Sequence, residues 1–137
     1  MDAKTNDLKS KLELYRASLG GGSFADCPVR NVISGIHGKW NPLLVMALAE
    51  RPYRFGELRR LVPDISQRML TQTLHDLQRD GYVRRKVFPT KQPSVEYSLT
   101  DLGRSMFEPL SQMVRWAEIN HDAVLAARAA FDAEQSA

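Results

Sequence analysis

The sequence predicts a mostly helical fold with one small β-hairpin (α+β), the winged helix-turn-helix. Three observations lead to this prediction. A short amphipathic helix is followed by a tight turn and a longer helix, two strand-like runs come directly after them, and a further long helix closes the chain. Helix, turn and helix in this order make a helix-turn-helix, to which the hairpin adds a wing. A chain of 137 residues provides one compact domain of this kind.

The composition excludes several classes of protein. Hydrophobic residues make up 43% of the chain and charged residues 26%, as in ordinary globular domains. No apolar run reaches the roughly 18 residues of a membrane span, and the polar start of the chain lacks the apolar core of a signal peptide. The single cysteine, Cys27, excludes a disulfide within the chain. We therefore expect a cytoplasmic protein that is not bound to a membrane.

Residues 1–22 are expected to form a helical arm. Leu8, Leu12 and Tyr15 lie about one helical turn apart, which is the spacing of an apolar stripe on one face of a helix. Three consecutive glycines then end that helix. The stripe predicts packing against a second subunit, and the alternative is an ordered tail without a role.

The domain proper is expected to span residues 23–120 and to begin with two helices. The first starts near Cys27 and the second covers residues 40–50, the most apolar stretch of the chain. A proline stands in the first turn of each, where its missing N–H costs no hydrogen bond. The inward face of the first helix is predicted to consist of Val29, Val32, Ile33 and Ile36.

The next two helices form the predicted helix-turn-helix. The shorter covers residues 55–62, and the longer, residues 67–80, is opened by Ser66 as N-cap and closed by Gly81. At about 100° per residue, each helix has one apolar side that must face the core. These sides consist of Phe55, Leu58, Leu61 and Val62 on the shorter helix, and of Leu70, Thr73, Leu74 and Leu77 on the longer one.

Residues 82–88 and 94–99 are the predicted strands of the hairpin. The second strand alternates apolar with polar residues, as a half-buried strand does. Thr100 is expected to cap a last helix, which Pro109 bends or divides, and residues 121–137 form a helical tail. The last helix has an unusually broad apolar stripe, which predicts a subunit interface. Its expected contacts are Met106, Leu110, Met113, Val114 and Ala117.

The charges are unevenly distributed along the chain. Residues 51–92 carry ten Lys or Arg against four acids, whereas residues 93–137 carry three Arg against seven acids. A basic segment of this kind indicates a surface that meets a polyanion. The outward side of the predicted helix 67–80 fits duplex DNA, because Arg and Gln can bind guanine and adenine edges bidentately in the major groove. The candidate base-reading residues are Gln67, Arg68, Thr71, Gln72 and His75.

Further residues are candidates for contacts with the DNA backbone, which add affinity and register without sequence information. Each of the charged ones is equally well explained as an ordinary surface charge. On the hairpin the candidates are Arg84, Arg85, Lys86 and Lys91, and on the other flank they are Lys39, Arg59, Arg60 and Ser66.

Several segments in combination resemble the HxlR-type winged helix-turn-helix regulators. They are Cys27-Pro28-Val29, Gly38-Lys39-Trp40, RFGELRRLVPDISQRMLTQTLHDLQRDGYVRRKVFP (54–89) and VEYSLTDLGRS (95–105). The resemblance covers about residues 26–120, and His37 departs from it, since such proteins more often have glycine there. It implies a sequence-specific DNA-binding transcriptional regulator, in the first place a repressor. It also implies a homodimer, bridged by its N- and C-terminal helices, on a near-palindromic operator.

The resemblance also implies an oxidant or small-molecule effector that acts through the cysteine before the proline, which here is Cys27. A helix N-terminus stabilises a thiolate, and Arg30 or His37 would add to that effect. The alternative is that Cys27 is a small buried apolar residue with no part in sensing.

Two other classes of function compete with DNA binding. The three histidines have no metal-ligand spacing, and the chain has neither a nucleophile elbow nor a glycine-rich phosphate loop. We therefore expect no catalysis, no metal and no cofactor. The remaining alternative is a winged-helix protein–protein interaction module that does not bind DNA.

Overall fold

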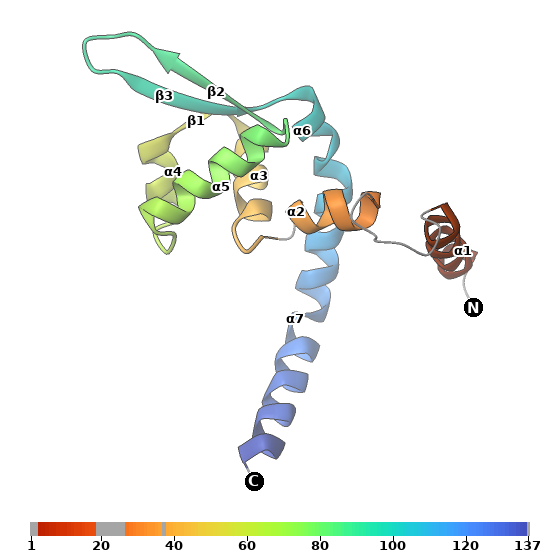
Figure 1. Cartoon of the computed structure of the whole chain (residues 1–137). Coiled ribbons are helices and arrows are strands. Elements are labelled where there is room, and N and C mark those ends of the chain that lie inside the picture. Colours follow the sequence, from red (N-terminus) through yellow and green to blue (C-terminus); the bar gives the residue numbers. More distant parts are fainter. Residues whose placement is uncertain (1–2, 19–26, 37, 137) are drawn as a thin grey trace. The chain divides into compact units, whose positions relative to one another are not determined.

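The computed structural model describes residues 3–18, 27–36 and 38–136 (Figure 1). The chain divides into two compact units, Met1–Asn41 and Pro42–Ala137, and each is described by itself. Within the described ranges, none of the helices is both long and apolar enough to cross a membrane. The same residues contain no group of three or more His, Cys, Asp or Glu that would hold a metal ion.

The first unit contains α1 (Ala3–Ser18) and a π-helical segment, η1 (Val29–Ile33), which continues into α2 (Ser34–Ile36). The predicted helix of the arm is confirmed, and it ends at Ser18, before the three glycines. The predicted inward face of the next helix is wrong for the single chain, since Val29, Val32 and Ile33 are all exposed. The physical reason is size, because a segment of about 40 residues or fewer rarely buries a core of its own.

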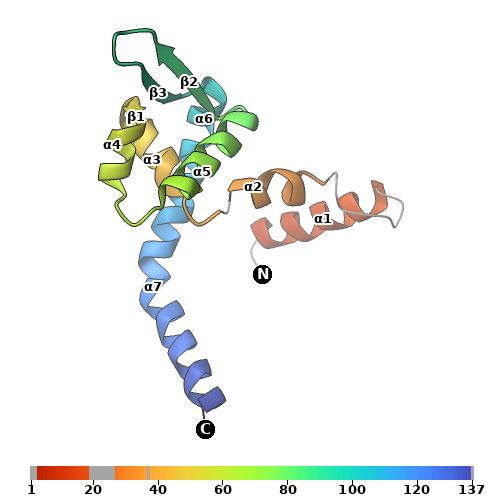
Figure 2. The ribbon, with the colours of Figure 1, turned by 60° about the vertical axis from the view of Figure 1, so that its left-hand side comes forward.

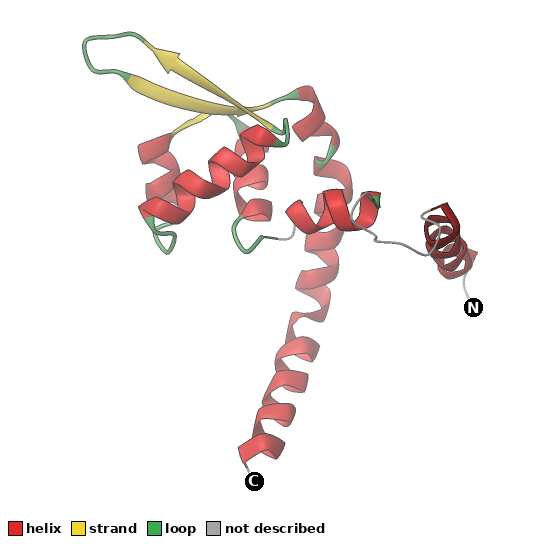
Figure 3. Cartoon of the chain, viewed as in Figure 1, coloured by secondary structure: helices red, strands yellow, loops and turns green. Residues whose placement is uncertain are grey.

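The second unit has the expected order of elements. The helices α3 (Asn41–Glu50), α4 (Phe55–Leu61) and α5 (Gln67–Arg79) precede the strands β2 (Val83–Phe88) and β3 (Ser94–Leu99). The helices α6 (Asp101–Ser105) and α7 (Phe107–Ser136) follow the strands. The hairpin of β2 and β3, residues 83–99, is called the wing below, and it extends beyond the helices in Figure 3.

A third strand, β1 (Tyr53–Arg54), lies between α3 and α4 and was not predicted. It pairs antiparallel with β3, so that the sheet has the order β1-β3-β2. Two residues are too few for the alternation that marks a strand in a sequence. The short strand nevertheless matters for the site, because it joins the start of α4 to the base of the wing.

The core of the second unit lies among α3, α4 and α5, beneath the sheet. Leucines from the three helices fill it, and the predicted inward face of α5 is confirmed, since all four of its residues are buried. The inward face of α4 is confirmed at Leu58 only. Leu61, the last residue of α4, is 50% exposed, and Phe55 and Val62 are half-buried. A helix of seven residues turns only one central position fully into the core.

The chain divides between α6 and α7 at Met106, three residues before the proline predicted to cause the division. Pro109 is instead the third residue of α7, where its missing N–H would have no partner within the helix. Thr100 caps α6 as expected, since its hydroxyl accepts from the N–H of Gly103 at 3.1 Å. Helix α7 continues without interruption to Ser136 and projects away from α3, α4 and α5 in both views (Figures 1 and 2).

Candidate nucleic-acid interface

Helix α5 is held at both ends by local hydrogen bonds. At its start, the hydroxyl of Ser66 accepts from the N–H of Met69 at 3.0 Å. At its end, Gly81 has a positive φ of 84°. Its N–H donates to the carbonyl of Gln78 at 3.0 Å, and that of Tyr82 donates to the carbonyl of Leu77 at 2.9 Å. This is a Schellman motif, which stops the helix and turns the chain into the wing.

The anchored helix presents one side to solvent. Because Leu70, Thr73, Leu74 and Leu77 are buried, the opposite side faces outward. All five predicted base-reading residues lie on that exposed part of the helix: Gln67, Arg68, Thr71, Gln72 and His75. Their placement agrees with the prediction, and their role in reading bases stays a prediction.

Hydrogen bonds distinguish these side chains from one another. The amide of Gln72 donates to Oδ1 of Asp76 at 2.9 Å, and the hydroxyl of Thr71 donates to the carbonyl of Gln67 at 2.9 Å. The Arg68 guanidinium, in contrast, has no ion pair within the described part of the chain. A base contact by Gln72 would have to replace the bond to Asp76, whereas Arg68 has no such bond to break.

The wing separates its cations onto two faces of the sheet. Arg85 stands opposite Tyr97, and its neighbour Lys86 stands opposite Glu96. Residues directly opposite one another in an antiparallel pair share a face, and successive residues alternate faces. Arg85 therefore shares the face of the buried Tyr97, whereas Lys86 has an acid as its cross-strand neighbour. The sequence prediction treated them alike, although they differ in electrostatic surroundings.

The remaining candidates for backbone contacts are also exposed. Arg59, Arg60 and Ser66 surround the turn between α4 and α5, and Nη1 of Arg59 donates to Oε1 of Gln67 at 3.4 Å. Arg84 lies on β2 and Lys91 in the tip of the wing. Lys39 belongs to the other unit, where its Nζ lies 5.0 Å from the centre of the Trp40 ring. Their contacts with DNA stay predictions.

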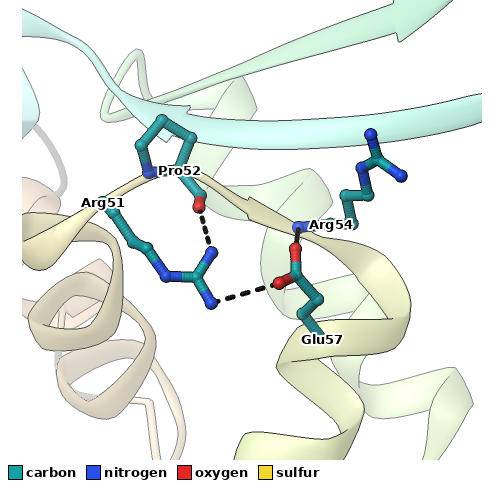
Figure 4. A network of polar contacts seen from close by, with 4 residues as sticks. All are labelled: Arg51, Pro52, Arg54 and Glu57. Carbon is teal, nitrogen blue, oxygen red and sulfur yellow. Dashed lines mark hydrogen bonds and ion pairs between the residues drawn. The ribbon is translucent and has the colours of Figure 1, made fainter.

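A polar network at the start of α4 was not predicted (Figure 4). Oε1 of Glu57 accepts from the backbone N–H of Arg54 at 2.9 Å, and its Oε2 lies 3.1 Å from Nη2 of Arg51. Arg51 also donates to the carbonyl of Pro52 at 2.8 Å and stacks on the ring of Tyr53, 3.8 Å from its centre. The bond from Arg54, followed by that from Arg51, lowers the pKa of Glu57, and the bond to Glu57 raises that of Arg51.

The residues predicted to form a subunit interface differ in accessibility. Met106 and Leu110 are buried inside their own chain, so that little of their surface is left for a partner. Met113 and Ala117 on α7 are exposed, as are Leu8 and Leu12 on α1; Val114 is half-buried, and the side chain of Tyr15 lies outside the described residues. Farther along α7, Trp116 is 58% exposed and Ile119 is 75% exposed. Ile119 was not among the residues predicted for the interface.

Cys27 is a free, buried cysteine, 5% exposed. Its carbonyl accepts from the N–H of Asn31 at 2.8 Å, so the residue stands at the start of the turn that leads into η1. This placement agrees with the predicted helix start, and the burial fits the structural interpretation of the thiol. His37, the other residue connected with thiol chemistry, lies outside the described residues.

Known proteins resemble most of this chain. The HxlR-like helix-turn-helix family matches residues 35–124. The HTH-type transcriptional regulator YtfH of Escherichia coli K12, whose role is uncharacterized, is 38% identical over 120 residues, which are 87% of this chain and 95% of YtfH.

Two solved structures of similar fold concern redox chemistry. The redox regulator HypR in its reduced form has a TM-score of 0.67 and 41% identity, covering 72% of this chain and 98% of its own. Diamide-treated YodB from Bacillus subtilis has a TM-score of 0.57 and 34% identity, covering 62% of this chain and 84% of its own. Both align with this chain over most of their own length.

Proposed function

The chain belongs to the HxlR-like helix-turn-helix family of DNA-binding transcriptional regulators, and we propose that it places α5 in the major groove of a near-palindromic operator as a homodimer. The exposed side of α5 carries this proposal. It presents Arg, Gln, Thr and His side chains between two helix ends that are fixed by hydrogen bonds. Side chains of these types recognise base edges.

The test of base reading begins with selection of bound fragments from random duplex DNA, which yields the operator and the spacing of its half-sites. In a dimer, the two α5 helices would enter the groove about 34 Å apart, one turn of the duplex. Arg68→Ala should then cost about 1–3 kcal/mol and relax the preference at one base pair per half-site. Arg128→Ala, which removes an exposed arginine near the end of α7, is the matched control.

If Arg68→Ala leaves both the preferred site and the affinity unchanged, α5 does not read bases through this residue. If the wild-type protein ignores all duplexes even at low salt, DNA binding itself is refuted and a protein-binding module takes its place. A reporter gene placed behind the selected operator then measures the sign of regulation. We expect repression, because a dimer on a promoter blocks polymerase, and activation would contradict it.

Exposed apolar side chains on α7 support the homodimer. Trp116, Ile119 and Phe131 are each more than half exposed on the single chain. Soluble monomers rarely expose large apolar surface in this way. The double variant Trp116→Glu/Ile119→Glu should be monomeric in analytical ultracentrifugation and still folded, because both positions lie outside the core. A monomeric wild type, or a variant that remains dimeric, would contradict this interface.

We further propose that oxidants act on DNA binding through Cys27. With one cysteine per chain, diamide must take its two electrons and two protons from two thiols, so the second thiol comes from another copy or from a small thiol such as glutathione. The burial of Cys27 slows this step, because reaction requires access to the sulfur. Diamide should reduce operator binding of the wild type and leave Cys27→Ser unaffected. Equal binding of both proteins before and after diamide would refute thiol sensing.

A further inference from the structure

A groove beside the wing contains an arginine that the sequence had not marked as a candidate. It has a volume of about 480 Å³ and lies between the start of α4 and the first half of β3, on the side of the wing's tip. Arg54 and Arg60 contribute cations to it, and Ser94 at the start of β3 also lines it. A second groove of about 560 Å³ adjoins it, shares Gly56 and Arg60, and adds Arg59.

The one acid that lines the first groove, Glu57, is already neutralised. Both its carboxylate oxygens accept hydrogen bonds, one from the backbone of Arg54 and one from the guanidinium of Arg51. Arg51 therefore balances this charge, and the bond from Arg54 uses only its main chain. The charges at the groove that Glu57 does not balance are the guanidinium groups of Arg54 and Arg60.

These two guanidinium groups have no acidic partner at ion-pair distance in the described ranges. Figure 4 shows the Arg54 side chain directed away from Glu57. Glu96 is the acid nearest in register, opposite Arg54 across β1 and β3. It stands between Arg54 and Lys86 in the sheet, so even this row of three side chains is net positive.

The Arg60 side chain lies beside Gly56. A Cβ atom built on Gly56 would stand 3.6 Å from Nη1 of Arg60. The Arg60 side chain thus reaches back one helical turn and lies over a part of α4 that has no side chain. This places its guanidinium where the two grooves meet.

We propose that Arg54 and Arg60 form a phosphate clamp that grips one DNA strand between α5 and the wing. The clamp rests on the proposed function and adds a binding site to it. In duplex DNA, one sugar–phosphate backbone runs between each major groove and the neighbouring minor groove. With α5 in the major groove and the wing at the minor groove, that backbone passes across α4. A guanidinium matches a phosphate with two parallel hydrogen bonds, and the hydroxyl of Ser94 adds a third donor.

The test measures fluorescence anisotropy of the selected operator and of an unrelated duplex between 50 and 200 mM salt. Each phosphate contact contributes about 0.9 to the slope of log K against log salt. Arg60→Ala should reduce that slope by about 0.9 on both duplexes, and Arg54→Ala should reduce it by somewhat less, because Glu96 stands opposite Arg54 as well as Lys86; neither should change the base preference. Arg54→Lys should keep the slope, because the charge remains. It should lose affinity, because lysine cannot make the second of the two parallel hydrogen bonds that arginine makes to a phosphate.

Arg54→Ala leaves the backbone N–H that Glu57 caps, so thermal unfolding should match the wild type. Arg128→Ala on α7 removes the same charge at a distance and should leave the slope unchanged. If the wild type binds with an Arg68-dependent preference while Arg54→Ala and Arg60→Ala keep the full slope, the clamp is refuted and the proposed function stands. A changed base preference in Arg54→Ala would also overturn the clamp. If the wild type binds no duplex, the proposed function itself has failed.

Discussion

Gly103 is the position where one added methyl group should damage the fold most clearly. A Cβ atom at this residue would lie 2.2 Å from the carbonyl oxygen of Tyr82 and 3.0 Å from Cδ2 of Leu99. Close carbon–oxygen contacts in proteins are about 3.3 Å or longer. Gly103→Ala therefore forces α6 to move by roughly 1 Å away from the chain that enters β2.

The movement strains the hydrogen bonds that join α6 to that chain. The N–H of Thr100 donates to the carbonyl of Tyr82 at 3.0 Å, and the Thr100 hydroxyl donates to the carbonyl of Gly81 at 2.5 Å. Overpacking costs about 1–3 kcal/mol, and a weakened hydrogen bond costs about 1 kcal/mol more. Alanine is a better helix former than glycine, and this offsets the loss by less than about 1 kcal/mol. We expect a net loss of about 2 kcal/mol, or about 10 °C in Tm for a unit of this size.

The assay is thermal and urea unfolding of the full chain, followed by circular dichroism. Gly56→Ala is the matched control, because its Cβ would meet only Nη1 of Arg60, at an ordinary 3.6 Å. That variant should unfold at or slightly above the wild-type temperature. If Gly103→Ala is as stable as Gly56→Ala, the close approach of α6 to Tyr82 does not limit the fold, and the reasoning is refuted.

Three further predictions follow from the same structure. Arg85→Ala should lower the slope of log K against log salt more than Lys86→Ala does, because Glu96 already offsets the charge of Lys86 across the strands. Equal slopes for the two variants would contradict this. Wild type should exceed Glu57→Gln in Tm at pH 7, because a lowered pKa gives stability that is fully present above the ordinary value of about 4.5 and is lost as the pH falls through the lowered pKa. A gap in Tm that persists once Glu57 is protonated in the folded chain would exclude the ion pair as its cause. Leu74→Ala should lower the free energy of unfolding by about 2–5 kcal/mol in urea, because Leu74 is buried. Met69→Ala should lower it much less, because Met69 is exposed. Similar losses for the two variants would contradict the orientation of α5.

The network at the start of α4 shows the limits of local patterns. The sequence places Arg51, Arg54 and Glu57 in a basic segment, and nothing in their spacing tells which arginine pairs with the acid. The short strand β1 makes that decision. By pairing with β3, it brings Arg51 over Tyr53 and against Glu57, and it leaves the Arg54 side chain directed elsewhere.

The sequence by itself determined the order of elements, the caps of α5 and α6, and the inward face of α5. All of these depend on residues close together in the chain, such as Ser66 beside Met69 or Gly81 after Asp80. The tertiary structure alone decided the pairing of β1, the break between α6 and α7 at Met106, and the two different surroundings of Arg85 and Lys86. These depend on contacts between residues distant in sequence, because register and packing are set by what lies across a strand or helix and not by what precedes it.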